Sequence, residues 1–177
     1  NTSTTIIPEQ SPIATCDGDE VQDGLYQFNL NSEVTPQILT GLPTGLVINY
    51  YLTADNAITE TNTLPNIFKN TISNSQTIYA RAVNGSDCYD IVPIELVVHT
   101  FDPPNFENET QYLCKGDQIT LSVAAGFKSY NWSNGITTNS ITIDNAGDYS
   151  VLVTDSNDCQ KTKTFKVILS EPAVITG

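Results

Sequence analysis

The segment from Ile141 to Cys159, ITIDNAGDYSVLVTDSNDC, constrains the fold of this chain more than any other. It holds two apolar runs that alternate with polar residues, and a period of two is that of a half-buried β-strand. A polar turn separates the runs, and a polar loop and a cysteine follow the second run. The segment therefore predicts two strands, a tight loop after the second, and a cysteine at its end.

The composition extends this prediction to the whole chain. Thr, Asn, Ser, Val and Ile are abundant and Met is absent, which favours strands and turns over helices. The length of 177 residues, 39% of them hydrophobic, suits two modules of about 90 residues, each with its own core. We therefore expect an all-β protein.

Breaks in the alternation predict the domain boundaries. Pro103-Pro104 follows the last strand pattern of the first half and predicts a stiff connection between modules placed end to end. The predicted segments are a linker or the end of a preceding module (1–12), a first module (13–100), a linker (101–111), a second module (112–170) and a lead into the next domain (171–177).

The cysteines repeat between the two modules. Cys16 and Cys114 each begin the pattern C-x-G-D, and Cys88 and Cys159 each follow an aspartate in a polar loop after a Val-rich run. Four cysteines predict an oxidising compartment and two structural disulfides, because a zinc site would need shorter paired spacings. Three pairings exist. The simplest places one bridge in each module, Cys16 with Cys88 and Cys114 with Cys159.

The second module carries features of the immunoglobulin fold. Asn145–Val151, NAGDYSV, resembles a tyrosine corner built on Tyr149, and Trp132 follows Leu121 as the packing tryptophan of an antibody-type domain would. Leu121 and Val151 occupy the places of the core cysteines, so the disulfide is expected outside the core. We predict two tandem immunoglobulin-like β-sandwich modules, each with one disulfide.

The amino-acid sequences of both modules resemble a known group of repeats. LCKGDQITLSV and the stretch from GFKSYNW to FKVILS are similar to the Ig-like repeats that precede the type B sorting domain in proteins exported by the Bacteroidetes type IX secretion system. CDGDEVQDGLYQFNL and TIYARAVNGSDC resemble longer repeats upstream in the same proteins, many of them surface adhesins linked to gliding motility. The resemblance implies a secreted cell-surface protein with these modules in its stalk.

An acidic loop is the candidate metal site. Asp17, Asp19 and Asp23 alternate in a short loop, and Asp87 would join them if Cys16 bonds Cys88. Calcium prefers several carboxylate and carbonyl oxygens, so this loop is a candidate calcium site. Val21 stands where an EF-hand-like loop needs a ligand, which favours a solvated acidic turn instead. No other cofactor is predicted.

Several functions are excluded or disfavoured. The net charge of −13 repels phosphate backbones and anionic lipid, so neither nucleic acid nor membrane insertion is expected. His99 is the single histidine, and no nucleophile and base form a catalytic set. Tyr130, or one ring of Tyr50-Tyr51 that alternation turns outward, could stack on a sugar.

We expect a non-catalytic stalk or adhesin module whose partners are neighbouring domains, surface-anchoring proteins and a surface ligand. The alternatives are a carbohydrate- or protein-binding module with calcium at the acidic loop, and a spacer in a secreted enzyme.

Overall fold

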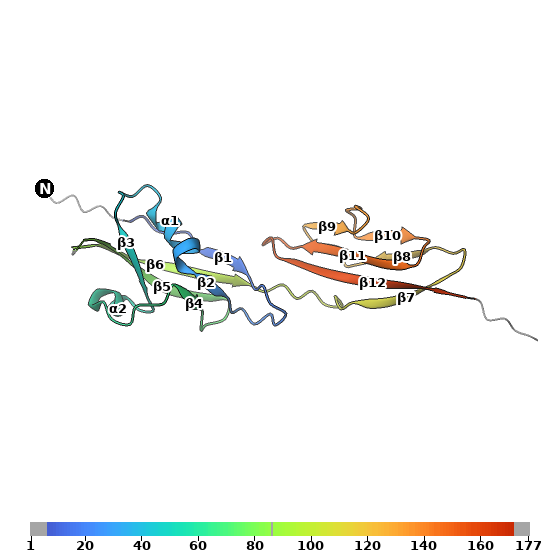
Figure 1. Cartoon of the computed structure of the whole chain (residues 1–177), viewed down its shortest axis with the longest axis horizontal. Coiled ribbons are helices and arrows are strands. Elements are labelled where there is room, and N and C mark those ends of the chain that lie inside the picture. The colour runs from blue at the N-terminus through green and yellow to red at the C-terminus, as the bar shows by residue number, and fades with distance from the viewer. Residues whose placement is uncertain (1–6, 86, 172–177) are drawn as a thin grey trace, which may run out of the picture. The chain divides into compact units, whose positions relative to one another are not determined.

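The computed structural model describes residues 7–85 and 87–171, with the side chains of residues 88 and 89 left out (Figure 1). The chain divides into two compact units, Asn1–Thr100 and Phe101–Gly177, and each is described by itself. In both units strands dominate and form sheet pairs of the immunoglobulin type. The prediction of an all-β protein built from two Ig-like sandwich modules is confirmed.

Unit 1 pairs a four-stranded sheet with a two-stranded sheet. The larger sheet has the order β1-β6-β5-β3, and the smaller one is β2-β4. β1 runs parallel to β6, whereas the other pairs are antiparallel. The strands are β1 (Ile13–Cys16), β2 (Gln27–Asn29), β3 (Val47–Tyr51), β4 (Ile67–Lys69), β5 (Ser75–Asn84) and β6 (Asp87–His99), and the helices are η1 (Leu30–Val34), α1 (Thr35–Leu39) and α2 (Ala54–Thr59).

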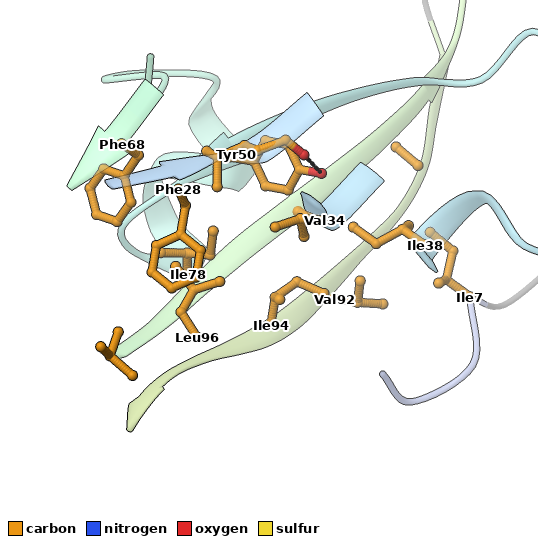
Figure 2. Packing of buried hydrophobic residues seen from close by; sticks show 14 residues of the cluster. Ile7, Phe28, Val34, Ile38, Tyr50, Phe68, Ile78, Val92, Ile94 and Leu96 are labelled. Atoms are coloured by element: carbon orange, nitrogen blue, oxygen red, sulfur yellow. Dashed lines mark hydrogen bonds between the residues drawn. The ribbon is translucent and has the colours of Figure 1, made fainter. Parts of the chain in front are cut away.

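The core of unit 1 lies between its two sheets and is closed by η1 and α1 (Figure 2). Leu30 and Val34 of η1 and Ile38 of α1 are almost fully buried, so the segment between β2 and β3 supplies core side chains. Tyr50 is also buried, its hydroxyl lies 2.7 Å from Thr35 Oγ1, and burial raises the Tyr50 pKa to about 12. The strand residues of this core include Phe28, Phe68, Ile78, Val92, Ile94, Leu96 and Val98.

Helix α2 covers the other face of the larger sheet. Thr53 caps it by accepting a hydrogen bond from Asn56 N at 3.1 Å. Arg81 of β5 donates to Ala57 O at 2.8 Å and forms an ion pair with Glu60 at the end of α2. The expectation that one ring of Tyr50-Tyr51 faces solvent is therefore wrong: Tyr51 is only 2% exposed, because this face of the sheet is covered.

Unit 2 repeats the sheet arrangement of unit 1. Its larger sheet has the order β7-β12-β11-β9 and its smaller sheet is β10-β8. As in unit 1, the first strand pairs parallel with the last one. The strands are β7 (Glu109–Cys114), β8 (Ile119–Ser122), β9 (Ser129–Trp132), β10 (Ser140–Ile143), β11 (Gly147–Thr154) and β12 (Gln160–Ser170).

The core of unit 2 is centred on Trp132. Its ring stacks on Phe165 with centroids 5.7 Å apart, and its Nε1 donates to Thr138 O at 2.8 Å. Outside the core, the Tyr149 hydroxyl donates to Asn145 O at 3.0 Å, which is the hydrogen bond that defines a tyrosine corner. The buried residues around Trp132 include Leu113, Leu121, Ile141, Val151, Val153 and Val167.

Residues 101–109, at the start of unit 2, pack on the sandwich of that unit. Phe106 is buried in its core, and Lys161 bonds Asp102 at 2.5 Å. Lys163 is 5% exposed and donates to Asn105 O at 3.0 Å and to Glu109 Oε2 at 2.9 Å. Much of the segment expected to be a linker is therefore held on the second sandwich.

Candidate functional site: a disulfide and its two supporting loops

Cys16 of unit 1 and Cys159 of unit 2 are each disulfide-bonded. Cys114 is a free, exposed thiol, and the side chain of Cys88 lies outside the described residues. The predicted pairing of one bridge per module, Cys16 with Cys88 and Cys114 with Cys159, is therefore wrong.

Strand register explains why Cys16 does not bond Cys88. Cys16 ends β1 and lies opposite His99, the last residue of β6. Cys88 lies at the start of β6, eleven positions before His99. At about 3.3 Å per residue this is a separation on the order of 35 Å. A disulfide needs Cα atoms within about 7 Å.

The same register separates the cysteines of unit 2. Cys114 ends β7 and lies opposite Ser170, the last residue of β12. Cys159 directly precedes β12 and is again eleven positions before that residue. In each module the two cysteines therefore lie beside opposite ends of the last strand. Their Cα atoms are too far apart for a disulfide within the module.

The loop after Cys16 is held by its own carboxylates. Asp17 N donates to His99 O at 2.8 Å, which continues the pairing of β1 with β6 beyond Cys16. Asp17 is buried and accepts a hydrogen bond from Gly24 N at 2.8 Å, which closes the loop. Asp19 and Asp23 each accept a backbone N–H two residues ahead, from Val21 at 2.8 Å and from Leu25 at 2.9 Å.

Gly24 fixes where this loop ends. Its φ is +74°, and a Cβ there would lie 2.4 Å from Asn74 Oδ1 and 2.7 Å from Asn74 N. Its carbonyl accepts hydrogen bonds from Asn74 N at 3.0 Å and from Asn70 Nδ2 at 2.9 Å. No side chain other than hydrogen fits this approach, so Gly24 anchors the loop that follows Cys16.

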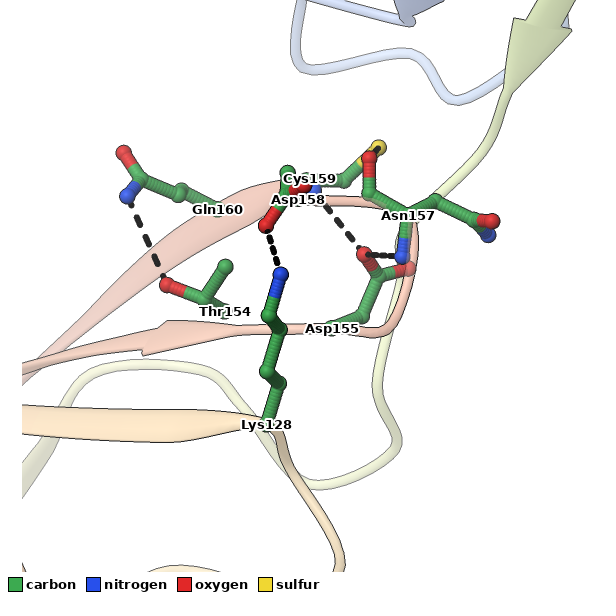
Figure 3. Close-up of polar contacts among 7 residues, drawn as sticks. All are labelled: Lys128, Thr154, Asp155, Asn157, Asp158, Cys159 and Gln160. Atoms are coloured by element: carbon green, nitrogen blue, oxygen red, sulfur yellow. Dashed lines mark hydrogen bonds and ion pairs between the residues drawn. The ribbon is translucent and has the colours of Figure 1, made fainter.

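Cys159 lies in the hairpin loop between β11 and β12, and Asp155 shapes that loop (Figure 3). Asp155 Oδ1 accepts hydrogen bonds from Asn157 N at 2.9 Å and from Cys159 N at 2.8 Å. Asp155 N in turn donates to Cys159 O at 2.9 Å. Cys159 is 1% exposed, and these hydrogen bonds hold its backbone in the loop.

Asp158 and Lys128 support the same hairpin. Asp158 has a φ of +65° and forms an ion pair with Lys128, whose backbone N–H donates to Thr154 O at 2.8 Å. Both charged side chains are largely exposed, so the pair contributes little stability in water. The sequence interpretation gave Asp155 and Asp158 no part in the hairpin. The Asx-turn pattern D-x-N before the cysteine was the available signal.

The acidic loop gives the calcium prediction no geometric support. Across residues 7–85 and 87–171, no group of three or more His, Cys, Asp and Glu side chains is placed to hold a metal ion. The carboxylates of Asp17, Asp19 and Asp23 accept backbone hydrogen bonds from their own loop instead. Asp87 is exposed at the start of β6, far along that strand from the acidic loop. The calcium site stays a prediction.

The remaining candidates do not converge on a binding site. Trp132 is 2% exposed, and the Tyr130 hydroxyl donates to Ala124 O at 3.2 Å. A surface pocket of about 310 Å³ is lined by residues of polar or charged type, and none of the candidate residues is among them. In the part of the chain that the structure describes, no helix is long and apolar enough to cross a membrane. The pocket is lined by Asn108, Glu109, Thr110, Asp148, Thr164 and Lys166.

The fold and the disulfide-bonded cysteines together define a class: Ig-like modules of the extracellular type. A family profile described as the Flavobacterium inter-domain disulphide bond domain matches residues 12–103, which is 92 of the 177 residues. The chain belongs to this family. The match covers unit 1, including Cys16 and Cys88, and ends before β7.

Solved structures with tandem Ig domains are similar over most of the chain, at low identity. The N-terminal four Ig domains of Dscam1 isoform 6.9 match 96% of this chain and 45% of that one, with 11% identity and a TM-score of 0.32. An I-band fragment of titin matches 93% of this chain and 64% of that one, with 13% identity and a TM-score of 0.33. The chain thus spans less than two thirds of the length of these structures.

A Bacteroides ovatus protein from a mixed-linkage glucan utilization locus, solved with a heptasaccharide, also matches. The match covers 93% of this chain and 46% of that one, with 10% identity and a TM-score of 0.28. No curated protein sequence matches the chain.

Proposed function

We propose that this chain is a non-catalytic stalk segment of a large secreted bacterial cell-surface protein, and that Cys16 and Cys159 bond each other and so limit the motion of one module relative to the next. The single observation that carries the proposal is that Cys16 and Cys159 are both disulfide-bonded although strand register excludes a bond within either module. Modules of one chain ordinarily move relative to one another unless their interface is large. A covalent link placed outside both cores restricts that motion and leaves each sandwich to fold around its own residues.

The positions of the polar and aromatic side chains support a mechanical role over a chemical one. The loop carboxylates around Cys16 and Cys159 accept backbone hydrogen bonds. His99, the single histidine, ends β6. The rings of Tyr50 and Tyr51 are buried and that of Tyr130 is half-buried, so the sugar-stacking alternative loses two of its three candidates.

The cellular location proposed for the stalk follows from the chemistry of disulfides and from the sequence. Structural disulfides persist outside the cytoplasm, so we place the chain on the extracellular side of the cell surface. The C-x-G-D repeats and the resemblance to type IX secretion repeats favour a sorting domain elsewhere in the protein and a role in adhesion or gliding motility. Its immediate partners are the neighbouring modules of the same chain.

Small-angle X-ray scattering tests the mechanical role. The double variant Cys16→Ser with Cys159→Ser removes the bond and is compared with the oxidised wild-type chain. The variant is expected to give a larger radius of gyration and a broader pair-distance distribution, because the modules then sample more orientations. Cys114→Ser is the matched control and should scatter as the wild type does. Identical curves for the double variant and the wild type would overturn the proposal.

A further inference from the structure

The entry segment of unit 2, residues 101–114, lies beside β12 along most of that strand (Figure 1). Its last part is β7, which pairs with β12 in parallel over six residues, from Glu109 opposite Phe165 to Cys114 opposite Ser170. The chain leaves the sandwich at the end of β12. The segments by which the chain enters and leaves unit 2 are therefore neighbours that run in the same direction.

Side-chain bonds extend this pairing beyond the β7–β12 ladder. Lys163 donates to Asn105 O at 3.0 Å and to Glu109 Oε2 at 2.9 Å, and it is only 5% exposed. Hydrogen bonds are stronger in such a low-dielectric position than in water. Two further links join β12 to the entry segment, from Lys161 to Asp102 at 2.5 Å and from Thr164 N to Asn108 Oδ1 at 2.8 Å.

Phe106 adds an apolar anchor among these polar links. Its side chain is 5% exposed and belongs to the core cluster that contains Trp132. Moving the entry segment along β12 would draw this ring out of the core and expose apolar surface to water, which is unfavourable. The entry segment is thus held to unit 2 by its backbone, by side-chain bonds and by a buried ring.

Pulling the chain from its two ends loads these contacts together. Tension draws the entry segment toward its N-terminal end and β12 toward its C-terminal end. Because the two are parallel, they separate along this line only by sliding past each other, and the evenly spaced hydrogen bonds of a parallel ladder then share the load. Separating two strands from one end instead breaks their bonds one after another, at a lower force.

We propose that the entry segment and β12 form a mechanical clamp, which resists unfolding of unit 2 when tension acts along the chain. The clamp consists of the β7–β12 ladder, the bonds of Lys163 and the buried ring of Phe106. Forced unfolding is governed by the unfolding rate, so the clamp raises the force that unit 2 withstands without requiring a high equilibrium stability. This function goes beyond the proposed restriction of motion between modules, because it resides within one module and needs no disulfide.

Single-molecule force spectroscopy on the whole chain tests the clamp by changing the direction of pull. The chain carries Cys16→Ser, Cys88→Ser and Cys159→Ser, so no disulfide bypasses a unit and Cys114 is the remaining thiol of the sequence. Some molecules are held at the two termini, which makes the entry segment slide along β12. Others are held at Cys114 and at the C-terminus, which separates β7 from β12 starting where Cys114 lies opposite Ser170.

Unit 2 is expected to unfold at a force at least about twofold higher when the chain is held at its termini, because the rate of forced unfolding then depends on breaking many contacts at once. Its unfolding releases roughly 20 nm of chain, against roughly 30 nm for the longer unit 1, so the two events are told apart. Equal forces in the two directions would overturn the proposal. This comparison leaves every contact of the clamp intact.

Lys163→Met provides the second measurement. It should lower the unfolding force between the termini and leave the force between Cys114 and the C-terminus unchanged, because Lys163 lies far along β12 from the end where that separation begins. A residue that only stabilises the fold would lower both forces, so equal losses would overturn the proposal. Lys166→Met, an exposed position on the same strand, is the matched control and should change neither force.

The outcome is independent of the small-angle X-ray scattering test of the stalk proposal. The chain that is pulled cannot form a bond between Cys16 and Cys159, so a failure of the clamp leaves the restriction of motion between modules untouched. A failure of that restriction likewise leaves the clamp within unit 2 untouched.

Discussion

At the scale of single residues, the disulfide depends on side chains that fix the backbone of each cysteine. Asp155 accepts N–H groups on both sides of the turn before Cys159, and Asp17 closes the loop that follows Cys16. Both aspartates belong to acidic stretches that resemble cation sites in sequence. The sequence alone does not distinguish an aspartate that accepts backbone N–H groups from one that binds calcium. The two roles can be separated only when the loop conformation is known.

Replacing Asp155 with alanine is expected to loosen the hairpin that carries Cys159. The change removes an acceptor shared by Asn157 N and Cys159 N, at a cost of about 1–3 kcal/mol in the free energy of unfolding of unit 2. The disulfide of Cys159 should also be reduced faster by dithiothreitol, because a mobile loop exposes the sulfur. Urea unfolding and timed alkylation measure the two effects.

Asp155→Asn is the matched control for that prediction. It keeps a carbonyl oxygen that can accept both hydrogen bonds, so most of the stability and most of the resistance to reduction should be retained. Equal losses in the alanine and asparagine variants would show that charge, and not the acceptor geometry, holds the loop.

At the scale of elements, the positions of strands could be predicted from the sequence, but the burial of a sheet face by a helix could not. Alternation located the strands, since each has one face on a core, as in Ile119–Ser122 and Gly147–Thr154. Alternation also predicted an outward-facing tyrosine beside Tyr50, but α2 buries Tyr51. Periodicity reports which face of a strand a residue occupies. It does not report whether a helix that follows the strand folds over that face.

The ion pair between Lys163 and Glu109 holds the entry strand of unit 2 to β12. Lys163→Met is expected to lower the free energy of unfolding by about 1–3 kcal/mol, since the bonds to Asn105 O and Glu109 and the contact of Nζ with the Phe165 ring are lost. Urea unfolding measures this loss, with the exposed Lys166→Met as the matched control. A loss of the same size in Lys166→Met would contradict the assignment.

The same pair makes the stability of unit 2 depend on pH. Hydrogen bonds from Gln111 and then from Lys163 lower the Glu109 pKa below its ordinary value. A lowered carboxyl pKa contributes stability that is present above the unfolded-state pKa and is lost as the pH falls through the folded-state pKa. The difference in unfolding free energy between wild type and Lys163→Met should therefore shrink on acidification below about pH 4. A difference that stays constant down to about pH 2 would contradict this.

At the scale of the whole molecule, the disulfide pattern was the feature that sequence reasoning missed. The repeat of Cys16 at Cys114 and of Cys88 at Cys159 was visible, and one bridge per module was the simplest interpretation. The parallel pairing of β1 with β6, and of β7 with β12, puts the two cysteines of a module at opposite ends of its last strand. Pairing partners of strands distant in sequence are set by topology, which alternation does not encode.

The most direct test of this account is a disulfide map of the 177-residue chain, purified without reductant, blocked with N-ethylmaleimide and digested unreduced. The account predicts one linked peptide pair that contains Cys16 and Cys159, with maleimide on Cys114. A Cys16–Cys88 pair together with a Cys114–Cys159 pair would contradict it, because each module would then be closed on itself and nothing covalent would restrain one module against the next.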